Sequence, residues 1–230
     1  HTDSHGRPVV VVTGMGVLTS LGEGQADNWA KLTAGTSGIK RITRFPLDHM
    51  RTTIAGTVDF VPADPFCAPE LSQRLADRVA EEAIAEAAIG TLKPGGGGNF
   101  PGPLFMALPP VELEWPQRQA LAAAATATLG KNDSVNYADI IAIADQEQFR
   151  DTYRRFLFSS VGEHLAERFG TKGSPIATST ACASGGTAIQ LAVESIRAGL
   201  SEAALVIGTD ASVNPESVIR FSLLSAPSTR

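Results

Sequence analysis

Short runs of hydrophobic residues alternate along the chain with stretches of helical periodicity. Apolar runs bounded by glycine or proline predict buried strands, and alternation of apolar and polar residues predicts a half-buried one. The strands predicted in this way are 8–16, 53–59, 104–108, 174–180 and 203–208. Four consecutive valines, Val9 to Val12, lie in the first of them.

Helices are predicted between these strands. The clearest amphipathic pattern is 71–89, where Leu71, Leu75 and Val79 share one face and charged residues lie mostly on the other. The segment 93–103 holds four consecutive glycines and three prolines, which predicts a loop. Further helical patterns, with a break at 130–134, are 25–33, 117–129, 137–153, 156–169 and 181–198. The alternation predicts an α/β layered fold with parallel strand pairs.

The composition is that of a globular protein able to bury a core. The 230 residues are 43% hydrophobic and 19% charged. No apolar stretch approaches the roughly 18–20 residues of a membrane helix, and the polar start lacks the apolar core of a secretion signal. We therefore expect a cytoplasmic protein without a membrane span. The net charge of −5 argues against nucleic acid as the main partner.

The two cysteines, Cys67 and Cys182, lie far apart in the sequence. Without a secretion signal, free thiols are expected rather than a disulfide, although one disulfide is arithmetically possible. No cysteine–histidine spacing indicates a zinc site. Cys67 precedes a predicted helix without a run of small residues around it, and we expect a structural role for it.

Cys182 lies in a segment, 175–186, that reads P-I-A-T-S-T-A-C-A-S-G-G. A predicted strand leads through a turn of small residues into a long predicted helix. The unpaired backbone N–H groups and the positive dipole end of a helix N-terminus favour a thiolate. The small neighbours leave room for a substrate and an oxyanion, as acyl transfer requires. The alternative is a buried cysteine that packs as a small hydrophobic residue.

Four segments carry a resemblance to a known family. They are S-T-A-C-A-S-G-G at 179–186, V-V-V-T-G-M-G-V-L-T-S-L-G at 10–22, T-S-G-I at 36–39 and F-S-L-L-S-A-P-S-T at 221–229. Together they resemble the β-ketoacyl-acyl-carrier-protein synthases of the elongating, type II-like class. In this resemblance Cys182 matches the family's nucleophile.

The resemblance implies a thiolase-like α/β fold with layers in the order α-β-α-β-α, built from two similar halves and usually found as a homodimer. The whole chain, 1–230, would be the amino-terminal ketosynthase domain, with an insertion at about 93–155. The second half of the family fold would lie outside this chain. That half supplies two histidines and a lysine in the family, and none of His1, His5, His49 and His164 lies in a matching motif. We therefore expect these groups after residue 230, and this span alone to be incomplete as an enzyme.

The resemblance also implies a reaction. Cys182 would take an acyl group from acyl carrier protein as a thioester. Malonyl-loaded carrier protein would lose carbon dioxide, and the carbanion would attack that thioester, so that a fatty acyl chain grows by two carbons. No metal or redox cofactor is required.

One segment departs from the family pattern. Where relatives carry a glycine-rich turn, the chain reads P-P-V-E-L-E-W at 109–115. That region shapes the acyl pocket in the family, so Val111 and Phe221 are candidate pocket residues. Both could instead pack the interior. The altered turn favours an unusual acyl chain, such as a very long one.

Carrier protein is acidic, so docking is expected on basic side chains. Arg74 and Arg78 lie on the helix that matches a docking element in relatives. A second basic cluster comprises Arg150, Arg154 and Arg155. The alternative for each of the five is an ordinary solvated surface.

Two other functions are compatible with the fold. The first is a non-catalytic partner that sets chain length in a heterodimeric synthase, but such partners typically lack the nucleophile that Cys182 would supply. The second is a thiolase acting on coenzyme A esters, whose cysteine lies earlier in the sequence. The G-M-G of 14–16 lacks the spacing of a dinucleotide fingerprint and is better explained by close packing.

Overall fold

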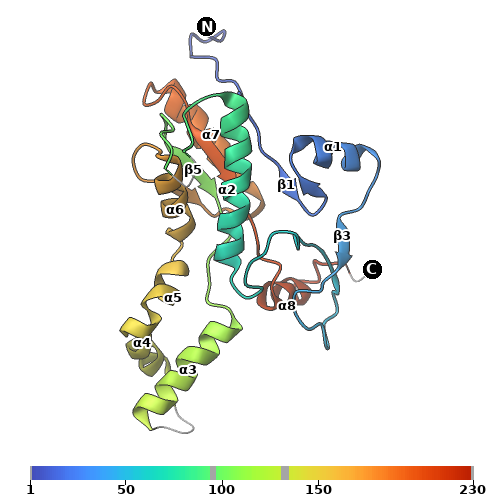
Figure 1. The fold of residues 1–230 in the computed structure, drawn as a ribbon, viewed down its shortest axis with the longest axis vertical. Coiled ribbons are helices and arrows are strands. Elements are labelled where there is room, and N and C mark those ends of the chain that lie inside the picture. The colour runs from blue at the N-terminus through green and yellow to red at the C-terminus, as the bar shows by residue number, and fades with distance from the viewer. Residues whose placement is uncertain (1, 94–96, 131–134, 229–230) are drawn as a thin grey trace.

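A three-stranded parallel sheet lies in the upper part of the protein as drawn in Figure 1. The structure, a computed structural model, describes residues 2–93, 97–130 and 135–228. The sheet has the order β6 (Ile176–Thr178), β5 (Leu104–Ala107) and β7 (Leu205–Gly208), with β5 in the middle. The predicted strands 104–108, 174–180 and 203–208 are therefore confirmed, with shorter bounds.

Helices cover both faces of this sheet. Leu104 and Met106 of β5 join a buried cluster with α2 (Ala68–Ala87) and α6 (Ser160–Phe169). Phe105 and Ala107 point to the other face and pack against α7 (Ser184–Arg197). All four residues of β5 are buried, which explains why the strand reads as a continuous apolar run.

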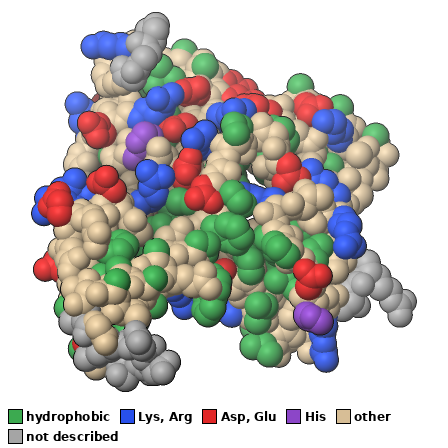
Figure 2. All heavy atoms as spheres, turned by 60° about the horizontal axis from the view of Figure 1, so that its bottom comes forward, with side chains coloured by type: hydrophobic (Ala, Val, Ile, Leu, Met, Phe, Trp, Pro, Cys, Tyr) green, Lys and Arg blue, Asp and Glu red, His purple; other side chains and the backbone are tan. Residues whose placement is uncertain are grey.

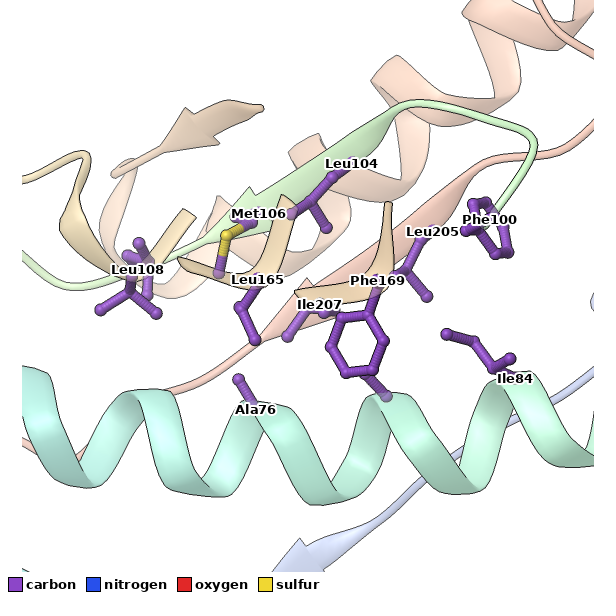
Figure 3. Packing of buried hydrophobic residues seen from close by; sticks show 12 residues of the cluster. Ala76, Ile84, Phe100, Leu104, Met106, Leu108, Leu165, Phe169, Leu205 and Ile207 are labelled. Atoms are coloured by element: carbon purple, nitrogen blue, oxygen red, sulfur yellow. The ribbon is translucent and has the colours of Figure 1, made fainter. Parts of the chain in front are cut away.

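The larger cluster joins α2 and α6 to the sheet. Figure 3 shows Ala76 and Ile84 of α2 pointing toward Leu165 and Phe169 of α6. Phe169 ends α6 and is fully buried, and Gly170 follows it in the left-handed conformation. The predicted helices 71–89 and 156–169 are confirmed as α2 and α6, and both begin at different residues from those predicted.

The first predicted strand, 8–16, is wrong. Beyond an isolated bridge at Pro8, the segment forms no strand, and the side chains of Val11 and Val12 are 68% and 77% exposed. The chain instead runs along α2, where carboxylate oxygens of Glu86 and Glu82 accept hydrogen bonds from the backbone N–H groups of Met15 and Val17 at 2.7 and 2.9 Å. At the end of the segment, these carboxylates accept the hydrogen bonds that a neighbouring strand would otherwise accept.

Two glycines permit this close approach. A Cβ atom on Gly14 would lie 2.2 Å from the carbonyl oxygen of Ala83, and one on Gly16 would lie 1.9 Å from that of Val79. These separations are too short for any side chain. The expectation that this glycine motif serves close packing is confirmed.

The remaining amino-terminal elements are small. Strands β1 (Leu18–Thr19) and β2 (Gly22–Glu23) form an antiparallel pair, followed by α1 (Gln25–Thr33), whose bounds match the prediction. Strand β3 (Ile39–Arg41) pairs with β4 (Ile54–Gly56), which lies within the predicted strand 53–59.

A helical lobe, 115–155, extends away from the sheet (Figure 1). It holds α3 (Trp115–Leu129), α4 (Tyr137–Ala144), a 3-10 turn (Glu147–Phe149) and α5 (Arg150–Arg155). The predicted single helix 137–153 is wrong. Ile143 and Phe149 both pack in the cluster against α3. In one continuous helix, Phe149 would lie about 120° around the axis from Ile143, and the two side chains could not share a face. The chain instead breaks between them.

The chain beyond the sheet forms one more helix, α8 (Pro215–Leu223), which the hydrophobic pattern does not reveal. Its N-cap, Asn214, accepts a hydrogen bond from the Ser217 N–H at 2.9 Å, and Pro215 begins the helix. Of the predicted break at 130–134, Gly130 ends α3, and 131–134 lie outside the described residues. Among the helices described, none is long and apolar enough to cross a membrane.

Candidate active site

Cys182 lies just beyond the carboxyl end of β6, within a 3-10 turn (Ala181–Ala183) that leads directly into α7. The predicted order of strand, cysteine turn and helix is confirmed, except that the first turn is 3-10 rather than α-helical. The carboxyl edge of a parallel sheet is where ligands bind in open α/β folds. Cys182 therefore lies at the edge of the sheet where a substrate is expected to bind.

The turn around Cys182 is held by Ser184. Its buried hydroxyl accepts a hydrogen bond from the Thr180 N–H at 2.8 Å and donates one to the Ala181 carbonyl at 2.7 Å. Ala181 has a φ of +50°, a left-handed conformation that is uncommon for alanine. The serine thus bridges the residues on either side of a strained position, immediately before the cysteine.

The space around Cys182 is open. The thiol residue is exposed, and a Cβ atom added to Gly185 or Gly186 would meet nothing within 4 Å. Cys67 differs in each respect. It is buried before the first residue of α2, and burial raises the pKa of its thiol. The alternative of a buried packing residue therefore applies to Cys67 and not to Cys182.

A cavity of about 50 Å³ opens at the same sheet edge, beyond β5 and β7. Val111 lines it, together with Leu108, Pro109 and Pro110 from the segment after β5 and Ser212 from the segment after β7. Residues of α2, α6 and α8 complete the wall. The cavity lining therefore includes one of the two predicted pocket residues.

A buried carboxylate, Glu114, forms part of this wall. Its side chain is 3% exposed, and its Oε1 accepts a hydrogen bond from the N–H of Ala68, the first residue of α2, at 2.6 Å. Burial raises the pKa of Glu114 to about 7. The Ala68 hydrogen bond lowers this pKa, and the charge of Glu216 raises it.

The other predicted site residues lie elsewhere. Phe221, on α8, is 54% exposed and does not line the cavity. Arg74 and Arg78 lie one turn apart on α2, and they pair with Glu70 at 2.6 Å and Glu23 at 2.7 Å. The acyl-pocket and docking roles of these residues stay predictions.

The second basic cluster is not a single patch of free cations. Arg150 pairs with Glu147 at 2.5 Å, and Arg155 reaches Glu70 at 3.3 Å. The carboxylate of Glu70 therefore links the two predicted basic groups, because it also binds Arg74.

His164 and His49 lie on segments other than the cysteine turn. His164 on α6 contacts Asp77 of α2 at 3.3 Å, and His49 is exposed in a loop. Within the described residues there is no group of three or more histidine, cysteine, aspartate or glutamate side chains arranged to hold a metal ion.

The family model for the N-terminal domain of beta-ketoacyl synthases matches residues 7–93 and 115–230, including the Cys182 turn. The chain belongs to the beta-ketoacyl synthase family. The stretch 94–114 is left unmatched and contains Val111 and Glu114. The family match therefore gives no information on the roles of these two residues. The extent of the predicted insertion at 93–155 stays a prediction.

Similar proteins include polyketide beta-ketoacyl synthases and a 3-oxoacyl-acyl-carrier-protein synthase. A putative polyketide beta-ketoacyl synthase 1 of Streptomyces cyaneus is 27% identical over 237 residues, covering 95% of this chain and 50% of that protein. The tetracenomycin polyketide synthase ketoacyl synthase alpha subunit of Streptomyces glaucescens is 27% identical, covering 97% and 51%. The 3-oxoacyl-acyl-carrier-protein synthase 2 of Coxiella burnetii is 51% identical over 55 residues, covering 24% and 13%. The chain spans about half the length of the first two relatives.

Solved ketosynthase structures share the fold. One is a type II polyketide synthase acyl-carrier protein in complex with its ketosynthase bound to the hexaketide, with a TM-score of 0.67 and 24% identity. The match covers 96% of this chain and 49% of the chain in that structure. A beta-ketoacyl synthase from Burkholderia phymatum STM815 has a TM-score of 0.60 and 23% identity, covering 96% and 51%. The predicted thiolase-like α/β class is confirmed, and the described residues contribute one three-stranded parallel sheet with helices on both faces, besides two antiparallel strand pairs.

Sequence reasoning missed Glu114 and Glu216. Glu114 is the N-cap of α3, and Pro116 after it marks a helix start that the pattern places at residue 117. Glu216 lies in the first turn of the missed helix α8, and its Oε1 accepts a hydrogen bond from the Trp115 N–H at 2.5 Å. Both contacts join segments far apart in sequence, so local patterns carry no signal for them.

Proposed function

We propose that this chain carries the acyl-accepting cysteine of a β-ketoacyl-acyl-carrier-protein synthase, an acyltransferase that forms carbon–carbon bonds. The observation that carries the proposal is the exposed Cys182 at the N-terminal end of α7, in a chain of the beta-ketoacyl synthase family. Relatives are named as a polyketide ketoacyl synthase subunit and as a 3-oxoacyl-acyl-carrier-protein synthase, so polyketide and fatty acyl chains are both candidate substrates.

The reaction has two steps, acyl transfer to Cys182 and decarboxylative condensation. In the first, the Cys182 thiolate attacks the carbonyl carbon of an acyl thioester on acyl carrier protein, and the carrier thiol leaves. In the second, malonyl-loaded carrier protein loses carbon dioxide, and the carbanion attacks the Cys182 thioester. The new carbon–carbon bond releases Cys182 and leaves a 3-oxoacyl group on the carrier, two carbons longer than the acyl group that entered.

The local structure supports the first step. The open space at Gly185 and Gly186 admits a thioester next to Cys182. Cys182 lies in the 3-10 turn that leads into the N-terminal end of α7, where the positive end of the helix dipole favours a thiolate and an oxyanion. The Ser184 hydrogen bonds hold the turn in place before the substrate arrives.

The partners are part of the proposal. We place acyl carrier protein, acyl- or malonyl-loaded, on Arg74 and Arg78, whose pairs with Glu70 and Glu23 would be exchanged for carrier carboxylates. A homodimer is supported by exposed apolar side chains such as Trp29 and Leu200. Figure 2 shows hydrophobic side chains gathered in the middle of one face, with charged ones around them. A cytoplasmic location stays a prediction.

The proposal is tested by the mass of the intact whole protein after incubation with acyl-loaded carrier protein. Wild type should gain one acyl group, and Cys182→Ala should gain none. Cys67→Ala is the matched control, because it removes the other thiol and should acylate like wild type. Acylation that persists in Cys182→Ala would contradict the assignment.

The non-catalytic chain-length partner is the second candidate. It would retain the fold and carry no acyl group, so the same experiment separates the two functions. The thiol of Cys182 favours the enzyme. A thiolase would accept acyl-coenzyme A in preference to acyl carrier protein, and a comparison of the two donors distinguishes it.

A further inference from the structure

The start of α3 meets the starts of α2 and α8 through two carboxyl groups. Glu114, the N-cap of α3, accepts a hydrogen bond through Oε1 from the N–H of Ala68, the first residue of α2, at 2.6 Å. Glu216, in the first turn of α8, accepts one through Oε1 from the N–H of Trp115, the first residue of α3, at 2.5 Å. The hold of α3 on both neighbouring helices therefore depends on these two side chains.

Three buried oxygen atoms at this junction have no hydrogen-bond partner among the described residues. They are Oε2 of Glu114, Oε2 of Glu216 and Oε1 of Gln117, which lies one turn after Glu114. All three are acceptors when both carboxyl groups are ionised, so they cannot satisfy one another. An ionised oxygen that water does not reach is costly, and a proton on one carboxyl group removes a charge and supplies a donor.

The proton belongs to Glu114. Burial raises the pKa of this carboxyl group from 4.5 to about 7, although the hydrogen bond from Ala68 lowers it. The charges of Glu216 on α8 and Asp64 before α2 also raise this pKa, and that of Arg44 after β3 lowers it. The junction therefore exchanges a proton near neutral pH.

The charged side chains at the mouth of the cavity keep their charge in this range. Arg220 of α8 donates from Nη1 to Oε1 of Glu112 at 2.9 Å, and Arg118 lies 3.5 Å from the same carboxylate. The hydrogen bond from Arg220 lowers the pKa of Glu112. These exposed pairs contribute little to stability, and α8 has no buried residue of its own. The attachment of α8 to α3 is therefore weak outside the junction.

The helical lobe 115–155 can move as one body. Its apolar side chains pack on its own helices, with Leu121 and Ala125 of α3 against Ile143 of α4. Figure 1 shows that the lobe extends away from the sheet. A change at the junction can therefore turn the lobe without disrupting its core.

Two further contacts between the lobe and α2 or the segment before it are polar. Nε2 of Gln117 donates to the Phe66 carbonyl at 2.9 Å, and Arg155 reaches Glu70 of α2 at 3.3 Å. Water can replace both of these contacts at low cost, because each replaces one hydrogen bond or ion pair by another.

We propose that Glu114 and Glu216 form a pH-sensitive hinge at the start of α3. With a proton on Glu114, the lobe is held against α2 and α8. When this proton leaves, the first turn of α3 separates from Ala68 and from α8, water reaches both carboxylates, and the lobe turns away as a unit. The cavity opens in the same movement, because Ala68, Glu114 and Glu216 all line it.

The hinge goes beyond the proposed function, since it does not require an acyl group on Cys182. Glu114 lies in the stretch that the family model leaves unmatched, so the hinge rests on contacts of this chain. The closed form binds the proton more tightly than the open form, in which the pKa of Glu114 returns to 4.5. The opening constant should therefore rise about tenfold between pH 6 and pH 8, and level off above pH 8.

Hydrogen exchange of single amides in the whole protein, followed by mass spectrometry between pH 6 and pH 9, tests the hinge. Each rate is divided by the intrinsic exchange rate at that pH. The amides of Ala68 and Trp115 should exchange faster than those of β5, and their corrected rates should rise about tenfold from pH 6 to pH 8. Amides of α3 beyond its first turn should show no such rise, because the lobe moves as a unit.

Three variants assign the effect. Glu114→Gln is neutral at every pH and keeps an oxygen for the Ala68 N–H, so the rise should disappear. Glu216→Gln keeps an acceptor for Trp115 and removes the neighbouring charge, so the rise should become smaller. Glu163→Gln, at an exposed carboxylate on α6, is the control and should keep the tenfold rise.

Several results would overturn the hinge. They are exchange of Ala68 and Trp115 only as slowly as β5, a rise of equal size in Glu114→Gln, and a rise along the whole of α3, which would mean unfolding of the lobe. Acylation of Cys182 is measured separately, so none of these results affects the proposed function. If Glu114→Gln does not fold, wild type and Glu216→Gln decide, and an equal rise in these two proteins contradicts the hinge.

Discussion

Glu114, the N-cap of α3, accepts a hydrogen bond at 2.6 Å from the N–H of Ala68, the first residue of α2. One side chain therefore satisfies a backbone donor at the start of a second helix. Glu216 of α8 does the same for Trp115 at the start of α3. The starts of three helices are linked in this way beside the cavity.

The buried Glu114 makes stability depend on pH. Its pKa is raised from 4.5 to about 7, so the folded protein binds this proton more tightly than the unfolded chain. The resulting stabilisation is complete below pH 4.5 and is lost as the pH rises through about 7. Between pH 5 and pH 8, the free energy of unfolding of wild type, measured with urea, should fall by roughly 1–3 kcal/mol more than that of Glu114→Gln. A difference that grows in the opposite direction would contradict the buried, protonated carboxyl.

The hydroxyl of Ser184 should matter for acylation as well as for stability. Ser184→Ala leaves the Thr180 N–H without its partner and frees the turn at Ala181, so we expect about 1 kcal/mol of lost stability and slower acylation of Cys182. Ser195→Ala, on the same helix, removes only a contact with Ser201 and serves as the control. Equal acylation rates in the two variants would exclude a positioning role for Ser184.

Gly16 should tolerate no side chain. In Gly16→Ala the new Cβ would lie 1.9 Å from the Val79 carbonyl oxygen, and the shift needed to relieve this overlap should cost about 1–3 kcal/mol. Gly208→Ala is the matched control, because its Cβ would lie 3.9 Å from Ala107, an ordinary contact. Thermal unfolding of the two variants measures the difference, and similar melting temperatures would argue against close packing on α2.

Two phenylalanines should respond differently to truncation. Phe169 is fully buried between α2 and the sheet, and Phe169→Ala should lose about 3–5 kcal/mol of stability. Phe221→Ala removes a half-exposed ring and should lose much less. If Phe221→Ala lowered the free energy of unfolding as much as Phe169→Ala in a denaturant titration, this would support interior packing of Phe221, the alternative to its predicted pocket role.

Charge reversal tests the docking arginines. Arg74→Glu and Arg78→Glu should slow acylation by carrier-bound thioesters and leave acylation by a small N-acetylcysteamine thioester unchanged. Arg51→Glu, at an exposed position away from α2, controls for net charge. Equal slowing with both donors would instead locate the defect at the cysteine. Stability should change by less than about 1 kcal/mol, because surface ion pairs contribute little.

Local patterns predict part of this structure and part of its site. The bounds of α1 and the turn at Cys182 follow from neighbouring residues, because capping, periodicity and small side chains act over a few positions. The strand prediction for 8–16 fails because the N–H of Met15, like that of Val17 just after the segment, donates to a carboxylate of a helix more than 60 residues away. Glu114 is missed for the same reason, since its partner Ala68 is 46 residues distant. The pairing of Arg74 and Arg155 on Glu70 also depends on the folded chain.

The attachment of the segment before β1 to α2 has a dynamic consequence. The N–H groups of Met15 and Val17 donate hydrogen bonds to two carboxylates of α2. Gly14 and Gly16 pack closely against the backbone of the same helix. Fraying of α2 would release all of these contacts together. Amide hydrogens at these two positions should therefore exchange with solvent in step with those of the second half of α2, as one cooperative unit.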